Sequence, residues 1–243
     1  MPRIDLNCDL GEGGDNDHAL MEWVTSINVA CGGHAGDEAT MRRTVAWANE
    51  RGVVVGAHPG YADRDHFGRR ELALTPAEIV QLVTEQVLRL MQISPVRHVK
   101  PHGALYNQAA RDPMIAEAIA AAVLRLDPRL VLVGLSGGAL TAAGRRVGLQ
   151  VADEAFADRT YEPDGTLTPR SVPGAVHRQT SAAVAQVMQL VTLGTVTSRT
   201  GATVPLCADT VCIHGDGTHA LEFAKALHLS LRKAGVELRP VPS

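Results

Sequence analysis

The 243-residue sequence contains few aromatic residues and few lysines. Phenylalanine, tryptophan and tyrosine together make up 3% of the residues, and only three of the 23 basic residues are lysines. The formal net charge is −3, and no run of like charge forms a basic patch. This composition gives no electrostatic basis for binding nucleic acid or an anionic membrane surface.

The sequence also lacks a long apolar stretch. None approaches the ~18 uninterrupted apolar residues of a membrane-spanning helix, and no apolar signal segment is found near residue 1. We therefore expect a cytoplasmic protein. The cysteines show no C-x-x-C spacing, so nothing indicates a structural zinc site or a redox pair; they are Cys8, Cys31, Cys207 and Cys212.

Motifs that bind nucleotide phosphates are missing. None of the lysines, Lys100, Lys225 and Lys233, lies in a G-x-x-x-x-G-K-[ST] loop, and residues 11–14 do not satisfy G-x-G-x-x-G. Residues 134–138 form only a loose glycine turn after an apolar run. No G-x-S-x-G segment, which would carry a serine nucleophile, is present. We therefore expect that the chain does not hydrolyse ATP by itself.

Short apolar runs alternate with longer stretches of helical period along the whole sequence. The runs predict strands at 4–8, 27–30, 53–57, 98–100, 130–134, 149–152 and 210–213. The periodic stretches predict helices at 37–51, 75–92, 113–126, 138–147, 181–193 and 218–234. Thr75-Pro76-Ala77-Glu78 is a strong helix start, with a capping residue, a proline at the first position and an acid at the third.

Repeated strand–helix units without a linker predict one α/β domain over residues 1–243 with a parallel sheet. A closed barrel and a doubly wound open sheet both remain compatible with this pattern. In either topology the functional residues belong at the carboxyl ends of the strands. Two long inserts, 60–74 and 158–170, are suited to cover such a site, and a small hairpin is expected near 195–206.

The segment DLNCDLGE, at residues 5–12, has an unusual polar face. With the period of a strand, Asp5, Asn7 and Asp9 lie on one side and apolar residues on the other. Burying carboxylates is costly unless they have partners. The segment therefore predicts other polar groups opposite this face.

Histidines follow four of the expected strands at equivalent places: His34, His58, His102 and His214. Each lies near glycines that let the backbone approach a ligand. Independent structural needs do not select one residue type at four strand ends, so we predict that these histidines share one polar site. With Asp9 and Lys100, they would shift one another's pKa values as general acid–base catalysis requires.

A divalent metal site is an alternative use of the same residues. Asp9, His34 and His58 form an Asp-His-His set of the type that binds zinc or iron with open positions. No H-x-x-x-H or H-E-x-x-H motif accompanies the set.

Several segments, in order, resemble the LamB/YcsF family, the A subunit of bacterial ATP-dependent 5-oxoprolinase. They are DLNCDLGE, SINVACGGHAGDE, GAHPGYADRDHFGRR, VKPHGALYN, EAFADRTY with GTLTPR, and CIHGD. The resemblance implies a distorted (β/α) barrel of about seven parallel strands, related to the glycoside hydrolase and deacetylase architecture. It also implies ATP-coupled opening of 5-oxo-L-proline to L-glutamate, with ATP as co-substrate of a complex that contains two further subunits.

Chemical reasoning assigns roles within that reaction. A lactam is a poor electrophile, so we expect partner subunits to phosphorylate its oxygen and this barrel to hydrolyse the activated species. Asp9 or His34 would be the general base, and Lys100 and His102 would stabilise charge on oxygen. His214 or Asp216 would protonate the leaving nitrogen. The predicted catalytic set is Asp9, Glu12, His34, His58, Lys100, His102, His214 and Asp216.

Other polar and aromatic residues of the same segments are predicted to bind the substrate. Arginine would hold its carboxylate or phosphate in bidentate fashion, and tyrosines would line the pocket. This set is Asn7, Tyr61, Arg69, Arg70, Tyr106, Asp158, Arg159 and Tyr161. Two other functions remain compatible with the sequence: a stand-alone metal-dependent amide hydrolase or deacetylase, and a non-catalytic subunit that binds the lactam.

Overall fold

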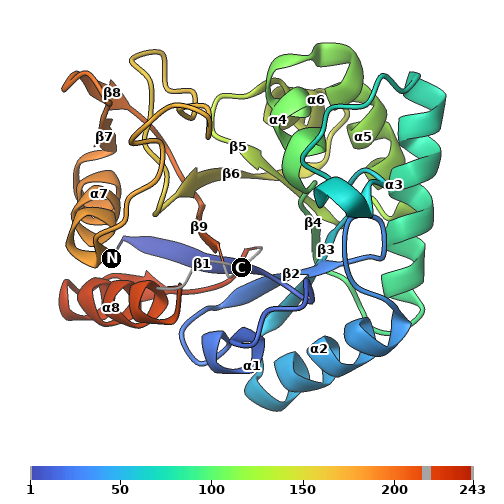
Figure 1. Cartoon of the computed structure of the whole chain (residues 1–243), viewed down its shortest axis with the longest axis horizontal. Coiled ribbons are helices and arrows are strands. Elements are labelled where there is room, and N and C mark those ends of the chain that lie inside the picture. Colours follow the sequence, from blue (N-terminus) through green and yellow to red (C-terminus); the bar gives the residue numbers. More distant parts are fainter. Residues whose placement is uncertain (1, 215–219, 242–243) are drawn as a thin grey trace.

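The computed structural model describes residues 2–214 and 220–241. Seven parallel strands form a closed barrel in the order β1-β2-β3-β4-β5-β6-β9, and β9 pairs with β1 to complete the ring (Figure 1). The strands are β1 (Arg3–Leu10), β2 (Ser26–Ala30), β3 (Val54–His58), β4 (His98–Val99), β5 (Val131–Leu135), β6 (Gln150–Phe156) and β9 (Thr210–His214). The predicted barrel of about seven strands is confirmed, and the open sheet is excluded.

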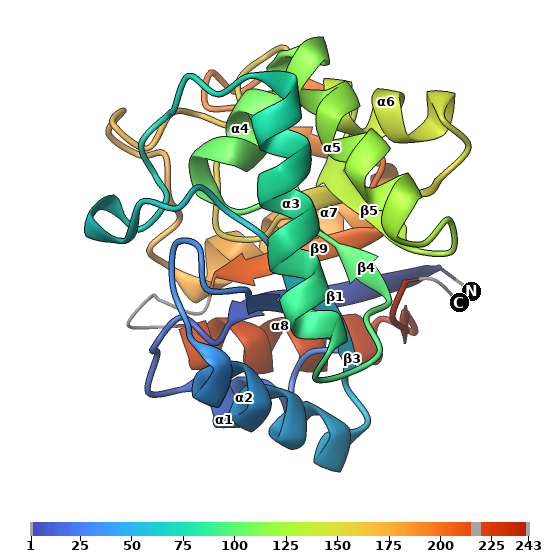
Figure 2. The same ribbon diagram turned by 90° about the vertical axis from the view of Figure 1, so that its right-hand side faces the viewer.

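Helices connect the strands on the outside of the barrel, as Figures 1 and 2 show. They are α1 (Asp17–Leu20), α2 (Glu38–Arg51), α3 (Pro76–Met91), α4 (Gly103–Arg111), α5 (Pro113–Leu126), α6 (Ala139–Arg146), α7 (Thr180–Leu193) and α8 (Ala220–Lys233). Within the described ranges, none of them has the length and apolar character needed to cross a bilayer. A final short strand, β10 (Glu237–Leu238), pairs with the start of β1.

Local sequence determines where several helices begin. The side chain of Thr75 accepts a hydrogen bond from the Glu78 backbone N–H, and Glu78 accepts one from the Thr75 N–H in return. Asp112 caps α5 by accepting from the Met114 N–H, with a proline at the first helical position. Both caps satisfy backbone groups that a helix terminus otherwise leaves without partners.

The two inserts and the small hairpin also appear. The first insert contains the short 3₁₀ helix η1 (Arg64–His66). The second is folded on itself by two isolated bridges, Arg159 with Val176 and Tyr161 with Leu167. The hairpin consists of β7 (Thr195–Thr197) and β8 (Thr203–Pro205), which pair in antiparallel fashion.

Some boundaries differ from the sequence expectation. The first and sixth strands extend further than predicted, so Asp9 and Glu154 lie inside strands rather than in the loops after them. Helix α4 is not predicted, because its N-cap, His102, makes no side-chain capping bond and gives no start signal. Its buried residues nevertheless follow a helical period.

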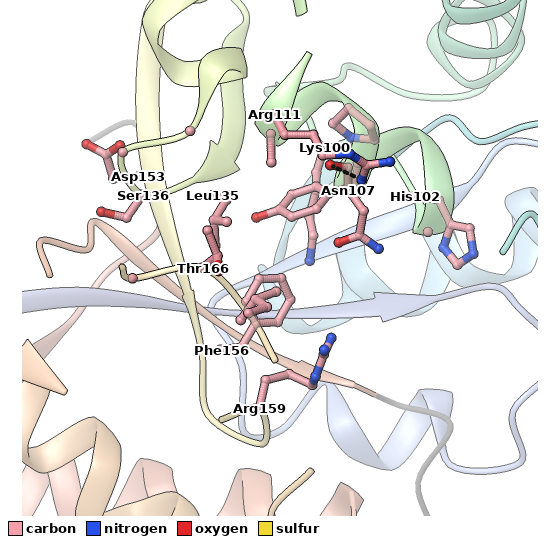
Figure 3. Close-up of a pocket in the computed structure, with 18 of the residues that line it drawn as sticks. Lys100, His102, Asn107, Arg111, Leu135, Ser136, Asp153, Phe156, Arg159 and Thr166 are labelled. Carbon is pink, nitrogen blue, oxygen red and sulfur yellow. Dashed lines mark hydrogen bonds between the residues drawn. The ribbon is translucent and has the colours of Figure 1, made fainter. Parts of the chain in front are cut away.

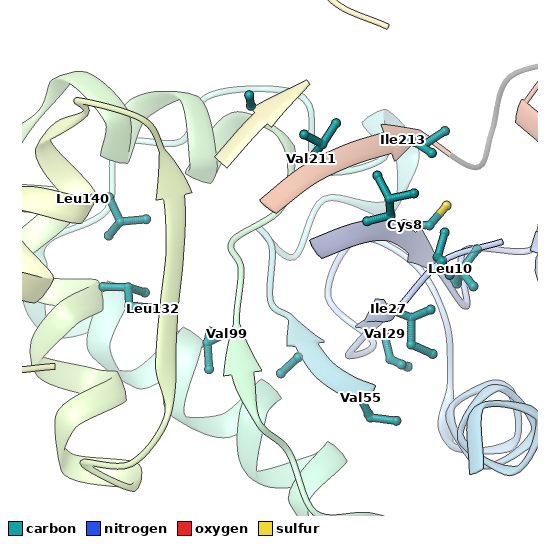
Figure 4. Packing of buried hydrophobic residues seen from close by; sticks show 14 of the residues in the cluster. Cys8, Leu10, Ile27, Val29, Val55, Val99, Leu132, Leu140, Val211 and Ile213 are labelled. Atoms are coloured by element: carbon teal, nitrogen blue, oxygen red, sulfur yellow. The ribbon is translucent and has the colours of Figure 1, made fainter. Parts of the chain in front are cut away.

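The two faces of the barrel wall differ in polarity. Leu6, Cys8 and Leu10 of β1 are fully buried in the main apolar core, and Figure 4 shows part of that core along β1 and β9. Asp5, Asn7 and Asp9, on the other side of β1, hydrogen-bond to polar residues of other strands. The predicted polar face of the first strand therefore points into the barrel.

A glycine creates room for one of the interior side chains. Gly56 of β3 lies opposite Asn28 of β2, and His98 of β4 donates from Nε2 to Asn28 Oδ1 at 2.7 Å. A Cβ atom at residue 56 would lie 2.0 Å from His98 Nε2. The barrel interior therefore requires glycine at this position.

We predict that Gly56→Ala lowers the free energy of unfolding by about 3 kcal/mol or more, because the new methyl group displaces His98 from a packed interior. Denaturant unfolding measures this change. The matched variant His98→Ala removes the obstructing ring. Adding Gly56→Ala to His98→Ala should cost little further stability, and an equal cost in both backgrounds would contradict the explanation.

Candidate functional site

A cavity of about 1250 Å³ opens at the carboxyl ends of the barrel strands. Six of the predicted catalytic residues line it: Asp9, Glu12, His58, Lys100, His102 and His214. Figure 3 shows His102 and Ser136 on opposite sides of it. The two inserts supply part of the wall, since Arg69 and Glu71 come from the first and Arg159 and Arg170 from the second. The side chains predicted from separate strand ends thus surround one hollow.

The Lys100 ammonium group lies at the base of this cavity and is 2% exposed. Its Nζ lies 3.0 Å from Asp9 Oδ1 and 2.9 Å from Glu154 Oε1. It also donates to Asn7 Oδ1 at 3.2 Å and to Cys212 Sγ at 3.0 Å. Burial lowers the pKa of Lys100, but the neighbouring acidic groups raise it well above its ordinary value, so the group is charged. One cation therefore neutralises carboxylates from two different strands.

Below the ammonium, hydroxyl groups hold the deepest carboxylate. Asp5 accepts hydrogen bonds from Thr25, Ser26 and Thr210 at 2.5–2.8 Å. Burial raises its pKa to about 6, although these hydroxyl groups oppose the change. Asn7 connects this layer to the ammonium, since its Nδ2 donates to Thr210 and to Glu154.

Asp9 is the carboxylate of the Lys100 network that reaches the cavity. Its Oδ1 accepts from Lys100 and, at 2.8 Å, from Asn28 Nδ2, while its Oδ2 lies 3.5 Å from His58 Nε2. Burial raises the pKa of Asp9, but His58 and Lys100 lower it more, and the net pKa is below the ordinary value. Asp9 is therefore an ionised base with one oxygen directed toward the histidines.

Four residues beside Asp9 form what we call the histidine cluster: Glu12, His34, His58 and His102. Glu12 Oε1 lies 2.9 Å from His34 Nε2, 3.3 Å from His102 Nδ1 and 3.8 Å from His58 Nε2. His58 Nε2 and His102 Nδ1 are 3.0 Å apart. The His34 and His102 rings stack at 3.6 Å, whereas the His58 and His102 rings are nearly perpendicular.

Backbone carbonyl groups fix two of these rings. His58 Nδ1 donates to the Lys100 carbonyl at 2.7 Å, and His102 Nε2 donates to the Phe67 carbonyl at 2.9 Å. Phe67 has a φ of 54°, a left-handed conformation that is rare for a residue other than glycine. Such strain persists only where the surrounding structure imposes it, and here it accompanies the carbonyl that holds His102.

Burial favours the neutral form of the enclosed imidazoles. It lowers the pKa of His58 to about 3, with a smaller contribution from His102, and it also lowers the pKa of His34. Burial raises the pKa of Glu12, but hydrogen bonds with His102 and His34 bring it below its ordinary value. The cluster therefore combines the neutral rings of His34 and His58 with an ionised carboxylate.

A further histidine, His214, lies on β9 outside the histidine cluster and also lines the cavity. His214 Nδ1 donates to both Asp158 oxygens, at 2.9 and 2.8 Å, and Arg170 donates to His214 Nε2 at 3.0 Å. Burial raises the pKa of Asp158, but His214 lowers it more, so its net pKa is below the ordinary value. Asp158 was predicted to bind substrate; in the structure it orients His214, whose ring lines the cavity.

The predicted substrate-binding residues divide between the cavity and the core. Arg69, Tyr106 and Arg159 line the cavity. Burial lowers the pKa of Arg159 to about 10, with a contribution from Arg170, and its guanidinium donates to the carbonyls of Thr168 and Ala175.

The other predicted substrate-binding side chains lie elsewhere. Tyr61 donates to Gln108, and the Tyr161 hydroxyl accepts from the Phe156 backbone N–H; both rings are fully buried in the main core. Arg70 pairs with Asp63 outside the cavity lining. The expectation that Tyr61 and Tyr161 line the pocket is corrected by their positions, and Arg70, expected to hold an anionic group of the substrate, also lies outside the lining. Asn7 is buried within the barrel, and Asp216 lies outside the described residues.

Sequence reasoning missed several contributors to the site. Asn28 and Glu154 complete the network around Lys100, and the Phe67 carbonyl and Arg170 hold the two histidines. The alternation of Ser26 and Asn28 with apolar residues in the second strand was an available signal for a polar interior. A carbonyl group carries no such signal, because any residue could supply it.

Two groups of described residues have a composition and spacing that could hold a metal ion. One is the histidine cluster, and the other is Asp9, Cys212 and His214. The predicted metal ligands are thus divided, because His34 and His58 belong to the first group and Asp9 to the second.

Comparison with known proteins finds relatives that match this chain over nearly its whole length. A protein from Bacillus subtilis (strain 168), named as the A subunit of 5-oxoprolinase, is 52% identical over an alignment 253 positions long, covering 99% of this chain and 98% of that protein. A protein of the same name from Brevibacillus brevis is 48% identical, covering 98% of both chains.

Solved structures resemble the barrel to different degrees. The crystal structure of a lactam utilization protein from Thermus thermophilus has a TM-score of 0.92 and 41% identity, covering 98% of this chain and 99% of that chain. The peptidoglycan deacetylase PdaC from Bacillus subtilis has a TM-score of 0.50 and 14% identity, covering 99% and 88%, and shares the fold alone. The family model described as the LamB/YcsF family matches residues 4–243, and with relatives about half identical over their full length, this chain belongs to that family.

Proposed function

We propose that this chain is the hydrolytic subunit of an ATP-dependent 5-oxoprolinase, which opens 5-oxo-L-proline to L-glutamate. The observation that carries the proposal is the convergence of five side chains on one cavity: Asp9, Glu12, His58, His102 and His214. The relatives named as the A subunit of 5-oxoprolinase support the substrate, and their being subunits supports an assembly. We take the barrel to act as one domain in the cytoplasm with two further subunits.

The chemistry of the lactam explains why the reaction would be divided between this chain and its partner subunits. A lactam carbon resists attack by water, and phosphorylation of its oxygen turns it into a reactive imidate-like centre. The sequence lacks a lysine loop that cradles nucleotide phosphates. Partner subunits would therefore consume ATP and form the phosphorylated lactam, and this barrel would receive it.

Hydrolysis of that species then proceeds in two additions of water. Asp9 takes a proton as the first water adds to the ring carbon, giving a tetrahedral centre that carries hydroxyl, phosphate and ring nitrogen. Protonation of the nitrogen breaks the C–N bond while the hydroxyl group loses its proton to water, and this leaves an acyl phosphate at the side-chain carbon of glutamate. A second water releases phosphate and gives glutamate.

The nitrogen must be protonated for the ring to open. If the tetrahedral centre loses phosphate first, the lactam returns and ATP is wasted. His214 is suited to protonate the nitrogen once the anionic substrate draws Arg170 away from Nε2, because its ring lines the cavity and Asp158 accepts from its Nδ1. We assign His214 as the general acid and Asp158 as its positioning residue.

Arginines of the cavity wall suit the anionic groups of the substrate. Arg69 and Arg159 lie on the lining, and guanidinium groups bind carboxylate and phosphate in bidentate fashion. The cavity of about 1250 Å³ exceeds the ~300–1000 Å³ of typical small-molecule pockets. Its size supports a site that accepts a phosphorylated species from a partner protein.

Lys100 supports the reaction through Asp9. Its Nζ has four acceptors, which already exceed its three protons, so little capacity remains for an oxygen of the substrate. We therefore assign Lys100 to the positioning of Asp9 instead of the stabilisation of charge on the substrate.

The direct test is a glutamate-release assay with 5-oxoproline and ATP. We expect glutamate only when this chain is mixed with its partner subunits, and none from the chain alone or the partners alone. Release by the isolated chain without ATP would contradict the proposal. It would support the alternative of a stand-alone amide hydrolase.

We also predict that Lys100→Met destabilises the fold by about 3–5 kcal/mol, because it leaves the carboxylates of Asp9 and Glu154 buried and unpaired. Denaturant unfolding measures the loss. Adding Glu154→Gln removes one of the unpaired charges and should recover part of it. A stable Lys100→Met protein that has lost only its activity would instead assign the ammonium to the substrate.

A further inference from the structure

The two ring nitrogens that face each other in the histidine cluster are both acceptors. A carbonyl oxygen only accepts hydrogen bonds, so His58 must carry its proton on Nδ1, toward the Lys100 carbonyl. By the same argument His102 carries its proton on Nε2, toward the Phe67 carbonyl. With both N–H groups directed at carbonyls, His58 Nε2 and His102 Nδ1 face each other across 3.0 Å, and a cation is needed between them.

A carboxylate oxygen joins these lone pairs. Glu12 Oε1 lies 3.3 Å from His102 Nδ1 and 3.8 Å from His58 Nε2. A single proton shared by the two nitrogens would not contact this oxygen, whereas a metal ion between them could contact all three atoms. Ligands bound tetrahedrally to zinc at about 2.0–2.1 Å lie about 3.3 Å from one another. The three separations, 3.0, 3.3 and 3.8 Å, lie on both sides of that value.

The surroundings of the rings are those of metal ligands. A histidine that binds a metal generally donates its other ring N–H to a carboxylate or a backbone carbonyl, and both rings do so here. The strained backbone at Phe67 supplies one of these carbonyls. His34 stacks on His102 and can donate from Nε2 to Glu12, which orients the carboxylate.

We propose that Glu12, His58 and His102 bind a divalent ion of the zinc class through Oε1, Nε2 and Nδ1. All three side chains line the cavity, whereas His34 does not, so a further coordination position faces the cavity. Two histidines and a glutamate with one open position are typical of catalytic zinc sites. His34 is a positioning residue in this assignment, because its ring is parallel to that of His102 and the two cannot direct their lone pairs at one point.

The other group with metal-binding composition is a weaker candidate. Asp9, Cys212 and His214 lie close together, but the Lys100 ammonium already contacts Asp9 Oδ1 and Cys212 Sγ at 3.0 Å each. A second cation at that position would be repelled by the first.

The inference deepens the proposed function, because a bound cation would add a Lewis acid at the wall of the hydrolytic cavity. Metal binding is measured without turnover, so the two can fail separately. If the zinc-containing protein releases no glutamate, the proposed function is contradicted and the metal site is not. If the metal-free protein still turns over substrate, the metal site is contradicted and the proposed function is not.

The experiment uses the full chain purified without chelators, with metal content measured by mass spectrometry. After removal of metal, zinc is added back in competition with a chromophoric chelator. We expect about one zinc ion per chain. Glu12→Gln, which keeps the shape of the side chain, and His102→Ala should each weaken zinc binding by at least about 100-fold, since even outer partners of a metal site contribute 10–100-fold.

Two further variants separate ligands from neighbours. His34→Phe keeps a stacked ring and should weaken zinc binding only about 10–100-fold, as loss of an orienting group does. His66→Ala is the matched control, because His66 also pairs with a carboxylate, Asp63 at 2.9 Å, but lies outside the cavity lining. It should leave zinc binding unchanged.

Absence of stoichiometric zinc binding by the folded, unaltered chain would overturn the proposal. The two nitrogens would then share a proton, which nitrogen-detected NMR of the histidine rings would show with and without added zinc. Equal zinc affinity in Glu12→Gln and the unaltered chain would also overturn it.

Discussion

Lys100 places a positive charge inside a barrel whose inner wall carries several acids. Its ammonium lies within 3.0 Å of carboxylate oxygens from β1 and β6 and donates to the amide of Asn7. Buried carboxylates are tolerated only with such partners, so this one cation makes a polar interior compatible with a stable fold. It also determines the state of the base: Asp9 remains ionised because one of its oxygens is held by the ammonium and by Asn28. The other carboxylate oxygen of Asp9 faces the cavity, near His58.

Above this network, toward the cavity, the polar side chains are placed for catalysis and not only for neutralising buried charge. The His58 and His102 rings of the histidine cluster are held by backbone carbonyls, whereas His214 is held by the Asp158 carboxylate. The two sides of the cavity are therefore suited to different tasks. The Asp9 side can accept protons and, in our proposal, bind a metal ion, and the His214 side can donate a proton to a leaving nitrogen. The strained carbonyl of Phe67 in the first insert and Arg170 in the second show that both inserts help to hold these groups.

The sequence predicts much of this arrangement, because periodicity and strand-end position are local properties. The alternation of Asp5, Asn7 and Asp9 predicts the polar inner face, and the histidines at four strand ends predict the shared cavity. The roles of Tyr61 and Tyr161 are not predictable in this way, since the conformation of a loop decides whether a ring meets the cavity or the core. Glu154 is missed as a partner of Lys100 because the extent of the sixth strand is misjudged by a few residues. The carbonyls that select the histidine tautomers carry no sequence signal at all.

The central claim is that His214, oriented by Asp158, directs the collapse of the tetrahedral centre toward ring opening. The most direct measurement is the ratio of glutamate to ADP formed by the complex that contains His214→Ala or Asp158→Asn. The account predicts that ADP still forms while glutamate falls by about 10²–10⁴-fold, the usual contribution of a general acid, and that His66→Ala leaves the ratio unchanged. If ADP and glutamate fall together and their ratio is preserved, the account is contradicted. His214 would then act at a step that precedes ring opening.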